Sequence, residues 1–334
     1  MTDQTPDNTP GLLYLTASDM QALGVTVADV ASLLEEVFRH KAAGDVVMPP
    51  GTLFHRQPLG WFNSLISFVP PLGFAGCKFQ CGSPKPAPGA PSIQGLYILS
   101  ENASGAMVAL MDSRWLTAIR TAAVGALMAR YEAPPGARQL AILGCGLQGR
   151  LQLEALKSGA PSVETCLAYD IDPAAARRYA DEMDGRFGVA VTPVDSAEAA
   201  VRGSDIVMTA GPILKDRRPV IAPDWLKPGC FVFAQDRDCY VTDDAIRAMD
   251  AVVTDDRADV AQAQAHEGFF AAVTRVDKEL SEIVRDGKGA RRRPEDRVLA
   301  LMLGIGLEDL GAAVEYYRRA KVRGVGTMLP PGWR

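Results

Sequence analysis

Three glycines spaced as G-x-G-x-x-G are the residues of this chain that point most directly to chemistry. The apolar run before them, residues 139–143, predicts a buried strand, and residues 150–157 after them predict a helix. At such a turn the first glycine permits the sharp bend, the second lets the backbone approach a pyrophosphate, and the third lets helix and strand pack closely. We therefore predict a dinucleotide-binding loop rather than a tight turn in an unrelated α/β protein. The expected cofactor contacts in this loop are Gly144, Gly146, Leu147, Gln148 and Gly149.

An acid at the end of the next predicted strand, residues 163–169, indicates which dinucleotide binds. Asp170 stands where such folds place the carboxylate that accepts hydrogen bonds from the adenosine ribose. The same carboxylate repels a 2′-phosphate, so we expect NAD(H) rather than NADP(H) as the cofactor. Arg177 and Arg178 follow closely and are able to accommodate a phosphate, although a solvated helix face is the simpler interpretation of this pair.

Composition excludes several classes of function. The 334 residues carry a net charge of −5, so no basic surplus points to nucleic acid or to an anionic membrane. The one basic run, 291–293, fits a solvated loop. Residues 1–10 lack the pattern of a targeting peptide, and we expect them to be disordered. The uncharged stretch 57–77 is interrupted by Pro70-Pro71 and by glycines, so short strands explain it better than a membrane span.

Cysteine and histidine usage argues against a metal site. The six cysteines are scattered, and only three histidines are present. Cys77 and Cys81 are the closest cysteine pair, but no second pair completes a zinc site. Reduced, mostly buried cysteines in a cytoplasmic protein fit this pattern best.

Hydrophobic periodicity divides the chain into three parts. Residues 16–43 predict helix with N-caps at Ser18-Asp19 and Thr26, residues 51–110 predict antiparallel strands, and residues 117–131 predict a helix rich in small residues. After the break at 133–136, strands alternate with helical segments. The predicted strands are 139–143, 163–169, 189–193, 205–209, 230–234 and 251–254, and the predicted C-terminal helices are 295–303 and 307–323.

This alternation predicts an α/β protein with a Rossmann-type doubly wound parallel sheet. The flanking parts predict a discontinuous α+β domain for substrate binding and dimerisation. We expect the NAD-binding domain at 131–304 and the second domain at 11–130 and 305–334.

Four further segments, taken in order, carry a resemblance to a known family. Residues 116–123, Leu-Thr-Ala-Ile-Arg-Thr-Ala-Ala, resemble the signature "LT..RTAA" of the ornithine cyclodeaminase/mu-crystallin family. Gly76-Cys77-Lys78-Phe79 is similar to the segment with that family's substrate-contacting lysine, and the glycine loop is similar to its "G.G.QG". Asp236 matches the family's "G-A-D" aspartate, and residues 306–309 match its late "G.A..D" element near the cofactor. The resemblance extends from Leu13 to about Gly326.

The resemblance implies a homodimer whose N-terminal strands pair into a shared barrel, with each active site between the two domains of a subunit. Members bind an amino, imino or keto acid and move a hydride to or from NAD(P). Some members close ornithine to proline with loss of ammonia, and others are ketimine reductases or amino-acid dehydrogenases. Thr121 and Gly306 are expected to contact the cofactor on the same grounds.

The matched residues suit this chemistry. Arg120 offers a fork of donors for an α-carboxylate, and Lys78 supplies a second positive charge or relays a proton. Asp236, after a strand of the parallel sheet, is placed to orient the substrate nitrogen or transfer a proton. Thr209, at another strand end, is expected beside the cofactor. The alternatives are a structural ion pair for Arg120, a solvent-facing Lys78, a loop role for Asp236 and strand-end capping for Thr209.

Two departures from the family leave the substrate open. The cyclodeaminases carry an arginine after "MPP", but here Gly51 follows Met48-Pro49-Pro50. His55 and Arg56 come shortly afterwards and are possible substitutes in substrate binding, although a half-buried strand histidine is an equal interpretation of His55. The segment 237–242 also differs from the family's "P-G-K-x-E-L". Both changes argue against ornithine cyclisation, and a pocket with Lys78, Arg120, Arg56 and Lys85 would suit a dicarboxylate such as iminosuccinate going to aspartate.

Three functions are therefore compatible with the sequence. The first is an NAD(H)-dependent reductase of a small α-imino acid, or equally an amino-acid dehydrogenase, with Lys78, Arg120 and Asp236 as catalytic residues. The second is a cyclodeaminase that releases ammonia and regenerates its NAD. The third is a non-enzymatic, nucleotide-dependent binding protein, which the pairing of Arg120 with Lys78 argues against.

Overall fold

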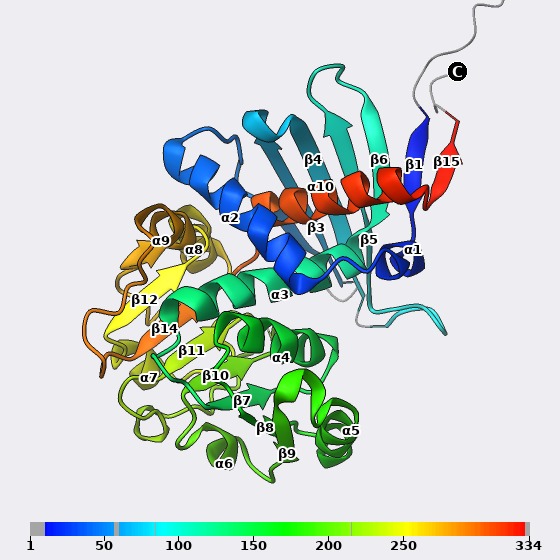
Figure 1. Cartoon of the computed structure of the whole chain (residues 1–334). Coiled ribbons are helices and arrows are strands. Elements are labelled where there is room, and N and C mark those ends of the chain that lie inside the picture. Colours follow the sequence, from blue (N-terminus) through cyan, green and yellow to red (C-terminus); the bar gives the residue numbers. More distant parts are fainter. Residues whose placement is uncertain (1–10, 57–59, 84, 215, 331–334) are drawn as a thin grey trace, which may run out of the picture.

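Two β-sheets separated by a layer of helices form the core of the computed structural model (Figure 1). The structure describes residues 11–56, 60–83, 85–214 and 216–330. Residues 1–10, for which we expect disorder, lie outside the described residues. Within the described residues, no helix has the length and apolar character needed to cross a membrane.

The first sheet is mixed and has seven strands in the order β15-β1-β6-β5-β4-β3-β2. Its long central strands pair antiparallel as predicted, whereas β1 pairs parallel to β6 and antiparallel to β15 at one edge. The chain's two ends therefore meet in this sheet. The strands are β1 Leu12–Leu15, β2 Thr52–Arg56, β3 Gly60–Val69, β4 Phe74–Gly82, β5 Ile93–Glu101, β6 Met107–Asp112 and β15 Thr327–Leu329.

The second sheet is entirely parallel and has eight strands in the order β13-β12-β14-β11-β10-β7-β8-β9. Sequence order reverses between β7 and β10, which is the topological switch point of a Rossmann-type sheet. The predicted fold class is thus confirmed, while the domain boundaries stay a prediction. The strands are β7 Gln139–Leu143, β8 Thr165–Tyr169, β9 Ala190–Pro193, β10 Ile206–Thr209, β11 Phe231–Ala234, β12 Ala251–Thr254, β13 Lys278–Glu279 and β14 Val298–Leu301.

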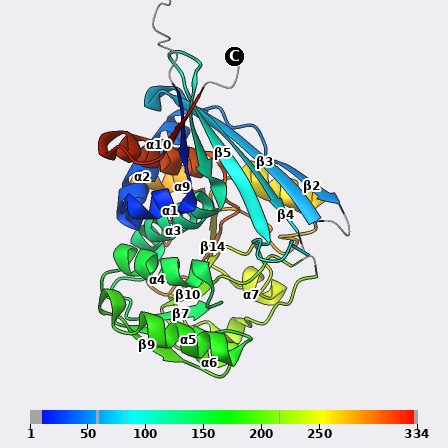
Figure 2. The same cartoon turned by 90° about the vertical axis from the view of Figure 1, so that its right-hand side faces the viewer.

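Helices pack on one face of the mixed sheet and continue onto the parallel sheet (Figures 1 and 2). α3 contacts both α10 and α4, so it lies between the two halves of the molecule. Its many alanines and one glycine permit this close packing on two sides. The helices are α1 Ala17–Ala22, α2 Val27–Ala43, α3 Ser113–Glu132, α4 Leu147–Gly159, α5 Pro173–Met183, α6 Ala197–Val201, α7 Asp243–Arg247, α8 Arg257–His266, α9 Leu280–Asp286 and α10 Gly306–Arg323.

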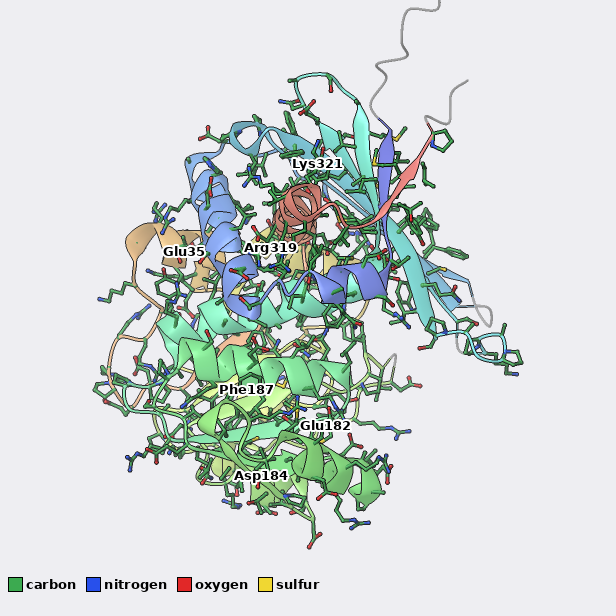
Figure 3. The ribbon with its side chains drawn as sticks, turned by 45° about the vertical axis from the view of Figure 1, so that its right-hand side comes forward. Glu35, Glu182, Asp184, Phe187, Arg319 and Lys321 are labelled. Carbon is green, nitrogen blue, oxygen red and sulfur yellow. The ribbon has the colours of Figure 1, made fainter. Side chains whose placement is uncertain are left out.

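Ion pairs at the surface join the helices of this layer. Glu35 on α2 accepts a hydrogen bond from Arg130 on α3 at 2.8 Å, and Arg319 on α10 lies 3.3 Å from Asp29 on α2. Figure 3 labels Glu35 and Arg319 on these neighbouring helices. Such exposed pairs contribute only about 0–1 kcal/mol each, so they orient the helices rather than hold the fold together.

The prediction of a helix at residues 295–303 is wrong. Val298–Leu301 forms β14, which is inserted between β11 and β12 in the middle of the parallel sheet. All four residues are fully buried, and a short apolar run of this kind has no periodicity that distinguishes a central strand from a buried helix. The predicted helix at 307–323 is confirmed and begins one residue earlier.

The predicted helix at residues 16–43 is two helices, because Gly24 adopts a positive φ of 59° and ends the first one. Thr26 caps α2 as predicted. The first cap is Thr16 rather than Ser18-Asp19, because Asp19 is the third residue of α1 and completes a capping box with Thr16. The helix predicted at 117–131 is confirmed and starts four residues earlier, at Ser113.

Candidate active site

The carboxyl ends of the parallel strands bring the predicted site residues to one edge of the sheet. The glycine loop follows β7, Asp170 follows β8, Thr209 ends β10, and Asp236 follows β11. Strands of a parallel sheet all point the same way, so these residues share the edge at which open α/β sheets bind their ligands.

The three glycines of the loop meet the demands of a dinucleotide cradle. Gly144 has a φ of 108°, and a Cβ there would lie 2.6 Å from the carbonyl oxygen of Ala210. A Cβ on Gly149 would overlap the carbonyl oxygen of Gly144, so α4 packs closely against β7 only with glycine at this position. A Cβ on Gly146 would meet no atom within 4 Å, which leaves the backbone open to an approaching pyrophosphate.

Groups beside the loop also suit NAD. Leu147 begins α4 and is half exposed, and the Oε1 atom of Gln148 is buried without a hydrogen-bond partner among the described residues. Asp170 accepts a hydrogen bond from the backbone N–H of Cys145 at 2.8 Å, which fixes its carboxylate next to the loop. Burial raises the pKa of the Cys145 thiol to about 12, and the side chain thus fills space rather than acting as a nucleophile.

Lys78 and Arg120 meet in a buried cluster with two acids. The Lys78 Nζ atom lies 2.8 Å from Asp309 Oδ2, and Arg120 Nη1 lies 2.6 Å from Glu308 Oε2. Arg120 Nε lies 3.4 Å from Asp309 Oδ1. The side chains of both cations are less than a tenth exposed, so neither is a solvent-facing residue. We call Lys78, Arg120, Glu308 and Asp309 the charge cluster.

Local structure explains how the charge cluster forms. Lys78 faces inward because the alternation of β4 places it on the helix-covered side of the sheet, where its Nζ also lies 3.4 Å from Thr117 Oγ1 on α3. Arg120 is one turn further along α3, and its guanidinium packs against Gly304. A Cβ at position 304 would overlap that guanidinium, and Gly304 has a φ of 83°, so this position requires glycine.

Burial and neighbouring charges both shift the pKa values of this cluster. Burial lowers the pKa of Lys78, with Arg120 contributing a like charge. Burial also disfavours the Arg120 cation, but Glu308 and Asp309 outweigh it and raise the pKa of Arg120. Burial raises the pKa of Glu308 to about 8, reinforced by the charges of Asp255 and Asp309. The cluster therefore contains a carboxyl group that exchanges its proton near neutral pH.

Asp236 is a second such group. Its carboxylate accepts hydrogen bonds from the Thr209 hydroxyl at 2.7 Å and from the Gly211 backbone N–H at 2.9 Å. The side chain is buried, and burial raises its pKa to about 7 despite these bonds. Thr209 thus has a partner in Asp236. The expected contact of Thr209 with a cofactor stays a prediction.

One buried amide connects the two halves of this site. The Nε2 atom of Gln152, on α4, donates to the carbonyl oxygen of Thr121 at 3.0 Å and to Gln235 Oε1 at 2.8 Å. Thr121 follows Arg120 in the chain, and Gln235 precedes Asp236. Gln152 therefore ties the arginine-bearing helix to the strand end that carries the acid, a role that no motif in the sequence signals.

For two of the remaining predicted residues, the structure describes the backbone but not the side chain. His55 and Arg56 lie in β2, opposite Trp61 and Gly60 of β3, but their side chains lie outside the described part of the structure. Their substitution for the missing arginine stays a prediction. Lys85 is exposed.

Two expected cofactor contacts instead have partners within the protein. The Thr121 hydroxyl donates to the Thr117 carbonyl oxygen one turn back, and the Gly306 carbonyl oxygen accepts from the Ser67 hydroxyl at 2.7 Å. Contacts of Thr121 and Gly306 with the cofactor stay predictions.

A family model confirms the resemblance over nearly the whole chain. The model described as the ornithine cyclodeaminase/mu-crystallin family matches residues 13–323. The chain belongs to this family. Among curated relatives, the nodulation efficiency protein NfeD of Rhizobium meliloti is 28% identical over 318 residues, covering 95% of this chain and 98% of that protein.

Solved structures of family relatives match the fold closely. Δ1-pyrroline-2-carboxylate reductase from Thermococcus litoralis, in complex with NADH and L-proline, is 27% identical with a TM-score of 0.85, covering 95% of this chain and 100% of its own. An archaeal alanine dehydrogenase dimer with bound NAD is 25% identical with a TM-score of 0.84, covering 95% and 98%. These structural homologues bind NAD or NADH in a shared fold.

The glycine loop makes a matched pair of substitutions informative. We expect Gly146→Ala to leave the melting temperature nearly unchanged, because its Cβ meets open space, but to weaken NADH binding about tenfold or more by blocking the pyrophosphate. We expect Gly149→Ala to lower both the melting temperature and the affinity for NADH, because α4 must move away from β7. Thermal unfolding and NADH fluorescence titration measure the two effects. Unchanged NADH affinity in Gly146→Ala would contradict the assignment of the loop.

Proposed function

We propose that this chain is an NAD(H)-dependent oxidoreductase that reduces the imine of a small α-imino acid to an amino acid, or runs the reverse dehydrogenation. The observation that carries the proposal is the burial of two cations, Lys78 and Arg120, in one cluster with acids. Burying charge is costly, and cations are retained inside proteins where they hold an anion in place. An α-carboxylate is the anion that an arginine fork and a lysine suit best.

The roles of the residues follow from their environments. Arg120 and Lys78 would bind the substrate carboxylate. Asp236, with a pKa of about 7, can hold a proton at neutral pH and deliver it to, or accept it from, the substrate nitrogen. Thr209 and the Gly211 backbone fix the orientation of that carboxyl group. NADH bound at the glycine loop would supply the hydride.

The family relatives support the same chemistry. One reduces Δ1-pyrroline-2-carboxylate, a cyclic imino acid, and another is an alanine dehydrogenase. Ornithine cyclisation is disfavoured by Gly51, which stands where the cyclodeaminases have arginine. A Cβ at this position would displace the end of the Leu65 side chain, and the Gly51 carbonyl oxygen accepts from Gln262 on α8.

We also propose that the chain forms a homodimer through the mixed sheet. Large apolar side chains are exposed on the face opposite Lys78 and the helices. They are Phe54, Phe62, Ile66, Phe79 and Leu96, which we call the bare face. Ile66 and Phe79 are each about half exposed, and a second copy of the sheet would cover such a patch. The alanine dehydrogenase relative is a dimer.

A substrate screen tests the enzymatic proposal. With NADH, ammonia and a panel of 2-oxo acids and cyclic imino acids, we expect NADH absorbance to fall for at least one substrate.

Two variants test the residue roles. Arg120→Lys should raise KM about tenfold or more, because lysine lacks the pair of donors with which arginine binds a carboxylate. Asp236→Asn should lower kcat about 100-fold or more. Arg130→Lys, on the exposed side of the same helix, is the control. Absence of turnover across the panel would contradict the proposal, and ammonia release from ornithine at constant NADH would favour the cyclodeaminase.

Replacing Asp170 tests the cofactor preference. Asp170→Ser keeps an acceptor for the Cys145 N–H but removes the charge that repels a 2′-phosphate. We expect the ratio of kcat/KM for NADPH to that for NADH to rise about tenfold or more. Asp181→Ser, an exposed substitution on α5, should leave the ratio unchanged. An unchanged ratio in Asp170→Ser would show that another group selects the cofactor.

A charge placed on the bare face tests the dimer. We expect Ile66→Glu to convert a dimer into a monomer in size-exclusion chromatography with light scattering, because a buried unpaired carboxylate costs several kcal/mol. Val322→Glu places the same charge on the exposed side of α10 and should leave the dimer intact. A monomeric unmodified protein would contradict the proposal.

A further inference from the structure

The charge cluster presents a problem for any anionic substrate, because Arg120 is already engaged. Its Nη1 atom donates to Glu308, its Nε lies near Asp309, and its Nη2 donates no hydrogen bond within the described residues. Glu308 therefore occupies part of the donor fork that the substrate carboxylate needs. Glu308 thus places a carboxyl group of the protein itself on this fork.

The count of buried charges shows that a carboxylate without a cation of its own binds more easily if a proton is added. Lys78 and Arg120 contribute two positive charges. Glu308 and Asp309 contribute two negative charges, and Asp255, whose carboxylate accepts from the backbone N–H groups of Leu303 and Gly304, adds a third. All of these residues are at least nine-tenths buried. Fully ionised, the group has a net charge of −1, and a bound carboxylate would bring it to −2 without water to screen it.

The contacts identify which acid takes the proton. Asp255 has three backbone donors, the N–H groups of Asp256, Leu303 and Gly304. Asp309 accepts no hydrogen bond among the described residues, but its two oxygens lie 2.8 Å from the Lys78 Nζ and 3.4 Å from the Arg120 Nε, so it faces two cations. Glu308 has only Arg120 at Oε2, and its Oε1 is buried without a hydrogen-bond partner among the described residues. A neutral carboxyl group would carry its proton at Oε1. The N-terminus of α10 favours the charged form by about 0.3–1 kcal/mol, which is less than the cost of burying an under-solvated carboxylate.

We propose that Glu308 gates the carboxylate subsite: the substrate carboxylate binds Arg120 when Glu308 is neutral, and ionised Glu308 competes for the same guanidinium. This inference rests on the proposed function, since it concerns the carboxylate of that substrate. Glu308 is a positioning residue in this scheme, because it acts through Arg120. No bond other than that to the proton changes.

The groups around Glu308 set the pH range of this competition. They are Arg120 on α3, Lys78 on β4, Asp309 on α10, Asp255 after β12 and, next to Asp309, Tyr97 on β5. Burial raises the pKa of Glu308 to about 8, so Glu308 is mainly neutral at pH 7 and ionised at pH 9. Above pH 8, a carboxylate should therefore bind together with a proton, and its affinity should fall about tenfold per pH unit.

Calorimetric titration of the full chain with a 2-oxo acid measures this proton directly. Pyruvate is titrated into the protein saturated with NAD⁺, and oxaloacetate is used if pyruvate does not bind. Each carries a carboxylate but no nitrogen cation, and with oxidised cofactor no hydride transfer follows. In two buffers of different ionisation enthalpy at pH 9, we expect uptake of about one proton per bound acid by the unmodified protein. This measurement needs no variant.

Two variants assign the proton to Glu308. Glu308→Gln is neutral at every pH, so we expect no proton uptake and an affinity independent of pH between 7 and 9. Glu315→Gln is the matched control, because Glu315 lies on the same helix and pairs with Arg319 at 2.7 Å, and it should behave like the unmodified protein. Proton uptake that persists in Glu308→Gln would come from Lys78 or Asp236 and would overturn the inference.

The outcomes separate this inference from the proposed function. Binding without proton uptake in the unmodified protein would overturn the gate and leave the reductase intact. Binding with uptake lost in Glu308→Gln, but without turnover in the substrate screen, would support the gate and contradict the reductase. If neither acid binds at any pH, the gate is contradicted, whereas the reductase is decided by the substrate screen alone.

Discussion

The buried ion pairs that Asp309 makes with Lys78 and with Arg120 are the interaction on which the rest of the structure depends. They join strand β4, helix α3 and helix α10, three elements that are distant in sequence. Removing one partner of such a pair costs about 3–5 kcal/mol, because the other charge is left buried and uncompensated. Under the proposed function, the same two cations bind the anionic substrate, so stability and binding would depend on one set of charges.

The parallel sheet provides the second constraint. Its strand ends bring the glycine loop, Asp170 and Asp236 to one edge, and Gln152 ties that edge to the helix that carries Arg120. The proposed dinucleotide and carboxylate sites are thereby held at the ends of strands and on the helices packed against them. The chemistry proposed for the chain requires this arrangement, because a hydride donor, a proton-holding acid and a carboxylate fork must act on one small molecule.

Much of this could be predicted from residue patterns. The glycine loop sits between an apolar run and a helical segment, and its physical demands are visible in the sequence. The position of Asp236 follows from the rule that parallel strands end at one edge. Lys78 and Arg120 were found only through their resemblance to family motifs, since an isolated lysine or arginine carries no local signal of burial.

The features that the sequence did not reveal depend on long-range packing. The sequence does not distinguish β14 from a buried helix, because four buried apolar residues have no periodicity. Glu308 and Asp309 lie in a recognised motif, but their pairing with Arg120 and Lys78 arises only when α10 packs against the mixed sheet. The sequence around Gln152 gives no sign of its hydrogen bonds to Thr121 and Gln235, because both partners are distant from it in the sequence. The roles of His55 and Arg56 in substrate binding stay predictions.

The position of β14 and α10 near the end of the chain has a consequence for synthesis. β14 fills the gap between β11 and β12, and α10 brings the counter-ions of Lys78 and Arg120. The N-terminal part of a chain leaves the ribosome first, so the nascent protein exposes a sheet with a missing central strand and two uncompensated cations until residues 298–323 emerge. Such an intermediate presents unpaired strand edges, and chaperone binding during translation would protect it at this stage.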